Sequence, residues 1–172
     1  MTTLPAFYLQ APFGGGLIFW CLEEKAFNLS FCSDSKKISA PESHIDIKNA
    51  LSDYFYNQKP IAAELGKKML SARNDLSIFQ KKILLALLDV PFAKTISYQD
   101  LAISAGLKPS AARAVGNACN KNPFPIFIPC HRVIPKNGTT GNFAWGEKTK
   151  AWLLTQEQAA CSTPLLKIIN SL

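Results

Sequence analysis

The stretch PFPIFIPCHRVIP, residues 123–135, is an apolar run with two reactive side chains, Cys130 and His131, at its centre. A cysteine flanked by hydrophobic residues is usually a small buried core residue, and burial raises the pKa of its thiol and keeps it inert. An imidazole in the next position changes this expectation, because a thiol with a base beside it is a typical nucleophile.

We expect residues 123–135 to form a strand-like wall that shields Cys130. Neighbouring side chains of an extended segment point to opposite faces, so His131 would act through a water or be oriented by a third group. A carboxylate suits that third position. Glu157, in a predicted final helix over 147–159, shares a helix face with Leu153 and Leu154 and is the candidate, although most helix glutamates are solvated.

The composition favours a globular cytoplasmic protein. The 172 residues suit one large domain or two small ones, and 48% hydrophobic residues are enough for a core. Five cysteines, an odd number without a CxxC pair, indicate a reducing compartment. The apolar run 16–22 is too short to span a membrane and follows no basic residue, so we expect neither a membrane span nor a signal peptide.

The positive charge lies in the second part of the chain. Residues 1–72 hold 7 Lys and Arg against 7 Asp and Glu, whereas residues 73–172 hold 12 against 5 and carry the whole net charge of +7. Such an asymmetry indicates that the second part meets a polyanion such as nucleic acid. An ordinary basic surface is the alternative.

The first part, residues 1–74, is predicted to be a small α/β domain. Two short strands within 17–32 follow a glycine turn at 14–16, and the polar stretch 71–75 is a plausible boundary. Residues 43–60 carry apolar side chains at helical spacing: Ile47, Leu51, Tyr54 and Phe55.

The second part, residues 75–172, is predicted to be mostly helical. Ser77 with Gln80, and Ser97 with Asp100, are capping patterns that open helices over 78–90 and 98–106. A further helix, 108–122, begins near Pro109 and is rich in alanine. A short helix, a glycine turn and a second helix are typical of a helix-turn-helix, whose second helix enters a groove of DNA.

The second helix of this pair is unusually poor in bulky side chains. Arg113 is its long charged residue among small ones, which favours close approach to DNA without base-edge readout. The alternative is that the alanines simply pack against neighbouring helices.

Several segments of the chain resemble those of a known protein family. The motif IPCHRVI (128–134) looks like the active-site motif of the O6-alkylguanine-DNA alkyltransferases, also called methylated-DNA–protein-cysteine methyltransferases. Further similar segments occur in the same order and spacing: ISYQDLA (96–102), AARAVGNACNKNPFPIFIPCHRVIP (111–135), GNFAWG (141–146) and KAWLLTQE (150–157). The first part is similar more loosely, through PFGGGLIF (12–19), LSDYF (51–55) and SIFQKKILLALL (77–88).

The resemblance implies an α+β fold: a small ribonuclease H-like α/β domain, followed by a winged-helix-like domain with a helix-turn-helix. It implies direct DNA repair, in which Cys130 takes a methyl or small alkyl group from O6 of guanine irreversibly and once per molecule. Activity on O4 of thymine is left open. The implied partner is double-stranded DNA bound largely without sequence preference, by a cytoplasmic monomer with no cofactor and with access to the nucleoid if the source is bacterial.

The resemblance also implies residue roles. Cys130 is the nucleophile, His131 draws off its proton through a water, Glu157 holds the imidazole and Asn122 braces the network. Arg113 fills the gap left by the flipped base, and Tyr98 helps to rotate the nucleotide and donates a proton towards the leaving guanine. Other expected positions are, for DNA, Ser97, Ala111, Ala112 and Gly116, and, for the alkylguanine pocket, Tyr98, Val133, Phe143, Ala144 and Trp145.

Two departures from the family pattern bear on specificity and metal content. Phe143 stands where relatives often have tyrosine, and Trp145 is predicted to narrow the pocket and favour methyl over benzyl. Some relatives carry a structural zinc near the N-terminus. Cys21, Cys32 and His44 do not make a four-ligand set, so we expect no metal.

Three alternative functions are consistent with parts of the sequence. A non-enzymatic binder of alkylated DNA shares the helix pair and the arginine but lacks the reactive cysteine, which Cys130 provides here. A cysteine hydrolase built on Cys130 and His131 leaves the basic half unexplained. A plain winged-helix DNA-binding module would leave Cys130 unmodified.

Overall fold

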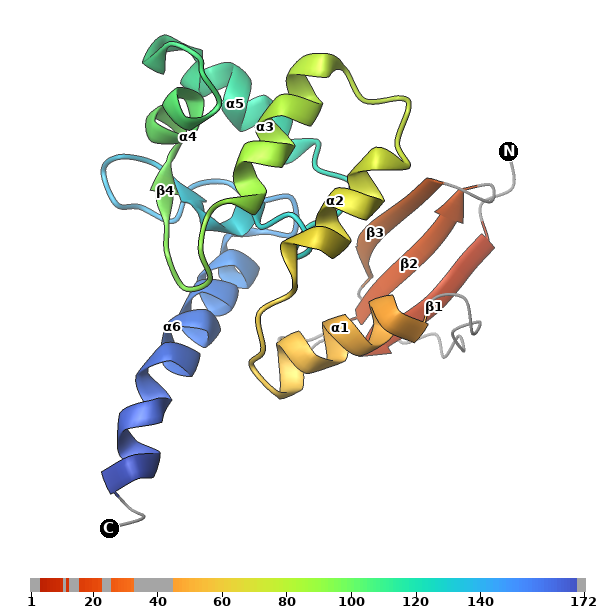
Figure 1. The fold of residues 1–172 in the computed structure, drawn as a ribbon, viewed down its shortest axis with the longest axis vertical. Coiled ribbons are helices and arrows are strands. Elements are labelled where there is room, and N and C mark those ends of the chain that lie inside the picture. Colours follow the sequence, from red (N-terminus) through yellow and green to blue (C-terminus); the bar gives the residue numbers. More distant parts are fainter. Residues whose placement is uncertain (1–3, 11, 13–15, 23–25, 33–44, 170–172) are drawn as a thin grey trace.

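The computed structural model describes residues 4–10, 12, 16–22, 26–32 and 45–169, with side-chain surroundings for Pro12 and residues 45–161. The architecture is mixed and helix-rich, with a small sheet (Figure 1). The sheet and α1 lie on one side of the molecule, α2 to α5 form a helical body, and α6 projects from that body towards the C-terminus.

The sheet is an antiparallel meander of β1 (Leu4–Gln10), β2 (Gly16–Leu22) and β3 (Ala26–Cys32) in the order β1-β2-β3. The two strands predicted within 17–32 are confirmed. The sequence analysis missed β1, an edge strand whose pairing shifts register between Pro5 and Phe7. Proline is tolerated at such an edge, where a backbone donor is not needed. Of the predicted glycine turn, residues 14 and 15 lie outside the described part of the chain.

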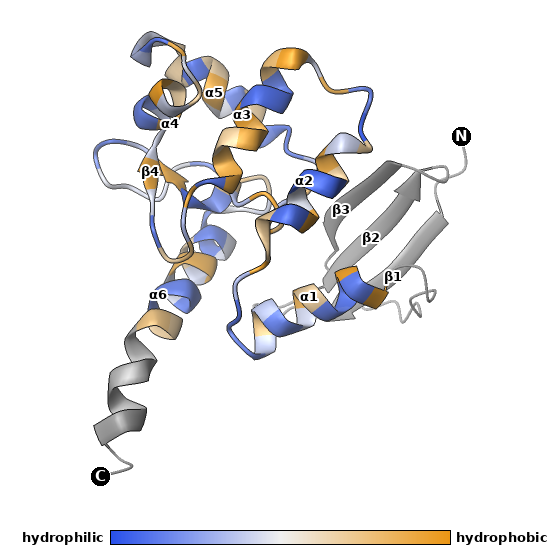
Figure 2. Ribbon diagram, viewed as in Figure 1, coloured by the Kyte–Doolittle hydropathy of each residue, from blue (hydrophilic) through white to orange (hydrophobic). Residues whose placement is uncertain are grey.

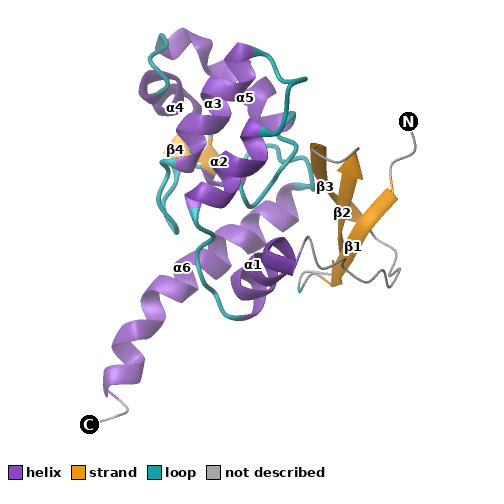
Figure 3. Cartoon of the chain, turned by 45° about the vertical axis from the view of Figure 1, so that its right-hand side comes forward, coloured by secondary structure: helices purple, strands orange, loops and turns teal. Residues whose placement is uncertain are grey.

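Helix α1 (Ile45–Tyr56) buries the predicted apolar face, which consists of Ile47, Leu51, Tyr54 and Phe55. The helix ends before Pro60, as expected. Figure 3 shows α1 from a second direction, between the sheet and α6. Two residues of its buried stripe contact α6: the Tyr54 hydroxyl bonds Glu157, and the Phe55 ring lies 6.3 Å from that of Trp152.

Helix α2 (Ala63–Ser71) was not anticipated. It buries Gly66, Met69 and Leu70 and packs against α3. Gly66 allows the close approach, because a Cβ at this position would lie 2.6 Å from Leu88 Cδ2 and 2.9 Å from the carbonyl oxygen of Phe127. This helix therefore supports the segment that leads to Cys130.

Helix α3 (Ile78–Leu88) begins with the predicted capping box. The backbone N–H of Gln80 donates to Ser77 Oγ, and the Gln80 side chain accepts from the Ser77 N–H, both at 3.2 Å. The helix carries Ile83, Leu84 and Leu87, which are fully buried, and hydrophobic colouring runs along it in Figure 2. It forms the centre against which α2, α4 and α5 pack.

The predicted helix pair is present. Helix α4 (Tyr98–Ser104) starts at the Ser97 cap, whose hydroxyl oxygen accepts from the Asp100 N–H at 3.1 Å. Gly106, with a φ of 65°, makes the turn that only glycine adopts without strain. A 3-10 turn, η3 (Pro109–Ala111), leads into α5 (Ala112–Asn120), which packs on both α3 and α4.

Residues 123–135 do not form the predicted strand-like wall. They make a buried loop, then a 3-10 turn, η4 (Cys130–Arg132), and only then a short strand, β5 (Val133–Ile134), which pairs in parallel with β4 (Ile96–Ser97). The physical reason is that prolines 123, 125 and 129 lack the N–H that a sheet ladder needs. Ile126 even has a φ of 77°, which breaks an extended run.

Helix α6 (Glu147–Ile169) continues beyond the predicted end at 159 and packs against η4. Leu153 is fully buried and Glu157 is 1% exposed, so the face predicted from the sequence does point inward. None of the helices in the described ranges is long and apolar enough to cross a bilayer.

The close approach at Gly66 provides a stability test. Gly66→Ala is expected to lower the free energy of unfolding by about 1 to 2 kcal/mol, because overpacking outweighs the gain in helix propensity. Gly116→Ala is the matched control, since its Cβ would lie an ordinary 3.6 Å from Tyr98 Cε1. It should raise the stability by up to about 1 kcal/mol. Equal urea midpoints for the two variants would contradict the packing argument.

Candidate active site

Cys130 is the first residue of η4 and is 5% exposed. Asn122, at the end of the turn after α5, holds it from one side. The Asn122 Nδ2 donates to Cys130 Sγ at 3.1 Å and to the Ile128 carbonyl at 2.8 Å, while its Oδ1 accepts from the Phe124 N–H at 3.0 Å. The predicted bracing role of Asn122 thus has a geometric basis, because one amide fixes both the thiol and the loop before it.

His131 is fully buried and contacts the predicted carboxylate. Its Nε2 lies 2.8 Å from Glu157 Oε1. Because a carboxylate only accepts, Nε2 must carry the proton, and Nδ1 is left with its lone pair. Nδ1 is buried and has no hydrogen-bond partner among the described residues. Burial lowers the pKa of the imidazole, so it is neutral and has the form of a base.

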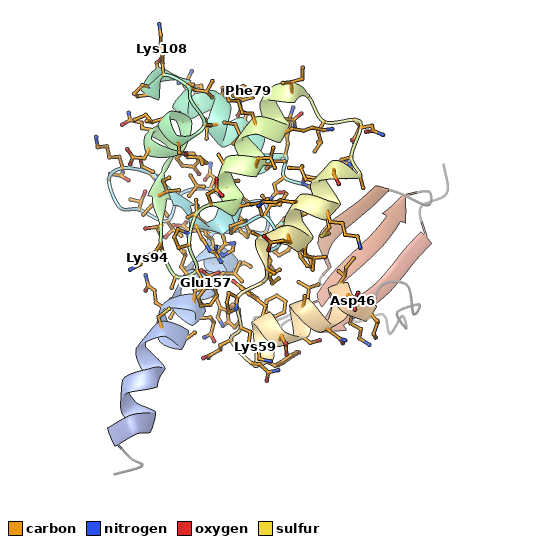
Figure 4. The ribbon with its side chains drawn as sticks, in the orientation of Figure 1. Asp46, Lys59, Phe79, Lys94, Lys108 and Glu157 are labelled. Carbon is orange, nitrogen blue, oxygen red and sulfur yellow. The ribbon has the colours of Figure 1, made fainter. Side chains whose placement is uncertain are left out.

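The Glu157 carboxylate is surrounded by donors. Oε1 accepts from Tyr54 at 2.7 Å and from Arg132 Nη2 at 3.0 Å, and Oε2 accepts from Arg132 Nε and the Ala93 N–H, each at 3.0 Å. Burial alone would raise the pKa of this carboxyl, but the bonds from His131 and Arg132 outweigh burial and lower it to about 2. Glu157 is therefore ionised at neutral pH, although it is buried. Figure 4 labels it on α6, where that helix meets the rest of the chain.

Sequence reasoning missed three partners of Glu157. Arg132 also donates to the Val90 carbonyl at 2.7 Å and lies over the Phe92 ring at 5.5 Å. Ala93 adopts a φ of 59°, which is strained for alanine. Tyr54 comes from α1. Of these only Arg132 carried a local signal, as the residue after His131, whereas Ala93 and Tyr54 reach the site through tertiary packing.

The thiol of Cys130 is not acidic in this state. Burial raises its pKa to about 11, although the Asn122 bond and the nearby Lys150 act in the opposite direction. Lys150 was also missed. It is fully buried, its Nζ donates to the Val133 carbonyl at 2.6 Å and lies 3.4 Å from the Asn142 oxygen, and burial lowers its pKa. Forming the thiolate therefore requires a base, and the neutral His131 is the adjacent one.

A cavity of about 580 Å³ opens onto the thiol. Seven of the predicted site residues are in its lining: Tyr98, Ala112, Arg113, Gly116, Cys130, Phe143 and Ala144. The remaining lining residues are Asn117, Cys119, Asn120, Pro135, Gly141 and Asn142. Helix α5 and the loop before α6 thus form two sides of the cavity.

Four of the positions predicted for DNA binding or for the alkylguanine pocket lie outside this lining. Ser97 caps α4, and Ala111 ends the 3-10 turn before α5. Val133 is fully buried in β5, where Lys150 bonds its carbonyl. Trp145 packs its ring on Phe143, with centroids 5.7 Å apart. Phe143 is itself in the lining, so Trp145 packs behind one wall of the cavity, and its predicted narrowing of the pocket stays a prediction.

Arg113 lies on the exposed side of α5 at the rim of the cavity. The described residues contain no group of three or more His, Cys, Asp or Glu side chains suited to a metal ion. The predicted lack of a zinc site concerned Cys21, Cys32 and His44, whose side chains lie outside the described part. A buried cysteine with an adjacent histidine and carboxylate, beside a helix-turn-helix, is the arrangement expected of a DNA-binding protein with a reactive thiol.

Comparison with known proteins agrees. Residues 78–159 match the family model described as 6-O-methylguanine DNA methyltransferase, DNA binding domain. The chain is 36% identical to the methylated-DNA–protein-cysteine methyltransferase of Methanosarcina barkeri, over 76% of this chain and 83% of that one. It is 42% identical to the protein of the same name from Cricetulus griseus, over 74% of this chain and 61% of that one.

A solved structure extends the likeness to the fold. The crystal structure of Mycobacterium tuberculosis OGT in complex with DNA superposes with a TM-score of 0.66 at 28% identity, covering 89% of this chain and 92% of that one. The present chain therefore belongs to the methylated-DNA–protein-cysteine methyltransferase family.

The depressed pKa of Glu157 makes stability depend on pH. A carboxyl with a lowered folded-state pKa stabilises the fold above its ordinary pKa of 4.5, and this contribution is lost as the pH falls towards about 2. Glu157→Gln should lower the free energy of unfolding by about 3 kcal/mol at neutral pH, since Arg132 loses its buried partner. The gap to the wild type should shrink between pH 4.5 and about 2.

The control is Glu64→Gln, which removes an exposed carboxylate 3.9 Å from Lys67 and should change stability by less than about 1 kcal/mol. Urea unfolding of the three proteins across this pH range tests the argument. A gap for Glu157→Gln that is constant with pH would show that the carboxyl is not ionised in the fold.

Proposed function

We propose that this chain repairs DNA by transferring a methyl or small alkyl group from O6 of guanine to Sγ of Cys130. The observation that carries the proposal is the placement of the Cys130 thiol, held by Asn122, at a cavity lined by the second helix of the helix-turn-helix. A base inside a duplex is shielded by stacking, so its O6 reaches such a thiol only after it is flipped into the cavity.

The chemical step balances without a cofactor. His131 accepts the thiol proton at Nδ1, through a bridging water, and Glu157 stabilises the imidazolium through Nε2. The thiolate attacks the alkyl carbon, the S–C bond forms and the C–O6 bond breaks. Guanine leaves with the bonding electrons and takes up a proton, and Cys130 keeps the alkyl group as a thioether. Thioethers are stable, so we expect one transfer per molecule.

Tyr98 and Arg113 fit the two DNA-side roles. Tyr98 lines the cavity, and burial raises the pKa of its hydroxyl, so it stays protonated and able to donate to the leaving guanine. Arg113 projects from α5 at the rim, where it would fill the space of the flipped base. Small residues beside it, Ala112 and Gly116, allow close approach to any sequence. Ser97 and Ala111, at the starts of α4 and α5, would contact the sugar–phosphate backbone of the DNA.

We assign residues 1–74 to a ribonuclease H-like domain and residues 75–172 to a winged-helix-like DNA-binding and transfer domain. The partner would be double-stranded DNA that carries O6-alkylguanine, bound by a monomer in the cytoplasm with access to the nucleoid if the source is bacterial. The excess of basic residues after residue 72 supports a polyanionic partner.

The transfer itself is tested by intact-protein mass. After incubation with a duplex carrying one O6-methylguanine, the wild type should gain about the mass of one methylene, mapped to Cys130, and Cys130→Ala should gain none. A wild type that binds the duplex but gains no mass would instead be a non-enzymatic lesion binder.

The role of Arg113 is tested by comparing substrates. Arg113→Ala should slow transfer from duplex DNA by about tenfold or more, and transfer from the free base O6-methylguanine by much less, because only the duplex requires base flipping. Lys108→Ala, an exposed neighbour in the same segment, is the control for the loss of one positive charge. Equal slowing of Arg113→Ala on both substrates would remove Arg113 from the flipping role.

A further inference from the structure

Tyr54 connects α1 to the proposed catalytic residues. Its hydroxyl donates to Glu157 Oε1 at 2.7 Å and lies 3.4 Å from His131 Nε2, across 103 and 77 residues of sequence. The side chain is 5% exposed. It lies before the segment that matches the family's DNA-binding model, which begins at residue 78. A residue from the first part of the chain therefore contacts both His131, the proposed general base, and the Glu157 carboxylate.

The Tyr54 ring is held edge-on by its neighbours. Its centroid lies 5.3 Å from that of Phe55, 6.3 Å from Phe92 and 6.5 Å from His131, at interplanar angles of 70° to 90°. Such contacts leave the hydroxyl little freedom. Burial, followed by the Glu157 charge, raises the pKa of this hydroxyl well above its ordinary value, so it acts as a fixed donor.

The two oxygens of Glu157 are occupied differently. Oε2 accepts from Ala93 and Arg132, whereas Oε1 accepts from Tyr54, Arg132 and His131. Tyr54 and His131 thus share one oxygen. A hydrogen bond donated to a carboxylate lowers its basicity, so the Tyr54 hydroxyl weakens the pull of Oε1 on the Nε2 proton.

We propose that Tyr54 is a positioning residue: it fixes Glu157 Oε1 against His131 Nε2 and moderates its charge, so that Nδ1 remains an unprotonated base for Cys130. This inference rests on the proposed alkyl transfer. It also gives α1 a part in the chemistry, because the helix delivers the hydroxyl to a network otherwise built from residues 90–157.

The charged and titratable groups that face His131 come from several elements. Glu157 and Lys150 face it from α6, Arg132 and Cys130 from η4, and Tyr54 from α1. Arg132 and Lys150 oppose protonation of the imidazole, and Glu157 favours it. Without the Tyr54 hydroxyl, the negative charge on Glu157 Oε1 acts more strongly on His131. The protonated form of the imidazole is then stabilised relative to the neutral form. The titration of His131 should then move to higher pH.

The test is Tyr54→Phe, which removes the hydroxyl and keeps the ring, beside Tyr56→Phe, a change on the same helix at a residue that is 56% exposed. Transfer from the O6-methylguanine duplex is followed by mass as a function of pH. Tyr54→Phe should slow transfer roughly fivefold to tenfold, a fraction of the roughly hundredfold or greater contribution of a general base. The acid limb of its profile should move up by roughly half a pH unit or more. Tyr56→Phe should match the wild type.

A second readout does not depend on transfer. The chain has two histidines, so the ring signals of His131 can be followed by NMR in both variants. The titration midpoint should rise in Tyr54→Phe alone. A wild type that takes no methyl group would overturn the proposed function, and the NMR midpoint would still decide the coupling. If Tyr54→Phe changes only the melting temperature, with its pH limb and midpoint unchanged, Tyr54 is structural and the inference fails.

Discussion

The site depends on the hydrogen bonds and the ion pair that the buried carboxylate of Glu157 forms. An ionised carboxylate inside a protein is costly unless donors surround it, and here they come from η4, α1 and the loop after α3. Each donor is fixed in turn, Arg132 by the Val90 carbonyl and Ala93 by a strained backbone. The charge therefore ties together elements that are far apart in sequence. It also determines which nitrogen of His131 carries the proton.

The two sides of Cys130 have different surroundings. On the protein side, the ionised and hydrogen-bonded neighbours of His131 determine its protonation. On the cavity side, the small residues of α5 leave an open volume of about 580 Å³. The thiol lies between them and is held by Asn122. Burial raises the pKa of this thiol to about 11, so at neutral pH it is in the less reactive thiol form.

Local patterns accounted for much of the architecture. The capping serines, the glycine turn at Gly106 and the apolar stripe of α1 act within one or two helical turns, so the sequence alone predicted them correctly. The strand expected over 123–135 was wrong, because its prolines remove the donors that a ladder needs. Strand β1 and helix α2 were missed: their sequences carry weak local signals, and pairing and packing with distant elements decide them.

By itself the sequence determined the helix pair and pointed to Cys130 and His131 as the proposed nucleophile and base, because these depend on residues adjacent in the chain or spaced by a helical period. Glu157 was also predicted, from the helix face it shares with Leu153. Only the tertiary structure decided which groups complete the site: Tyr54, Ala93 and Lys150 carry no local mark of their roles. Their contacts form because buried charged groups such as Glu157 and Lys150 need hydrogen-bond partners. Any residue that tertiary packing brings close can supply one, however distant it is in the sequence.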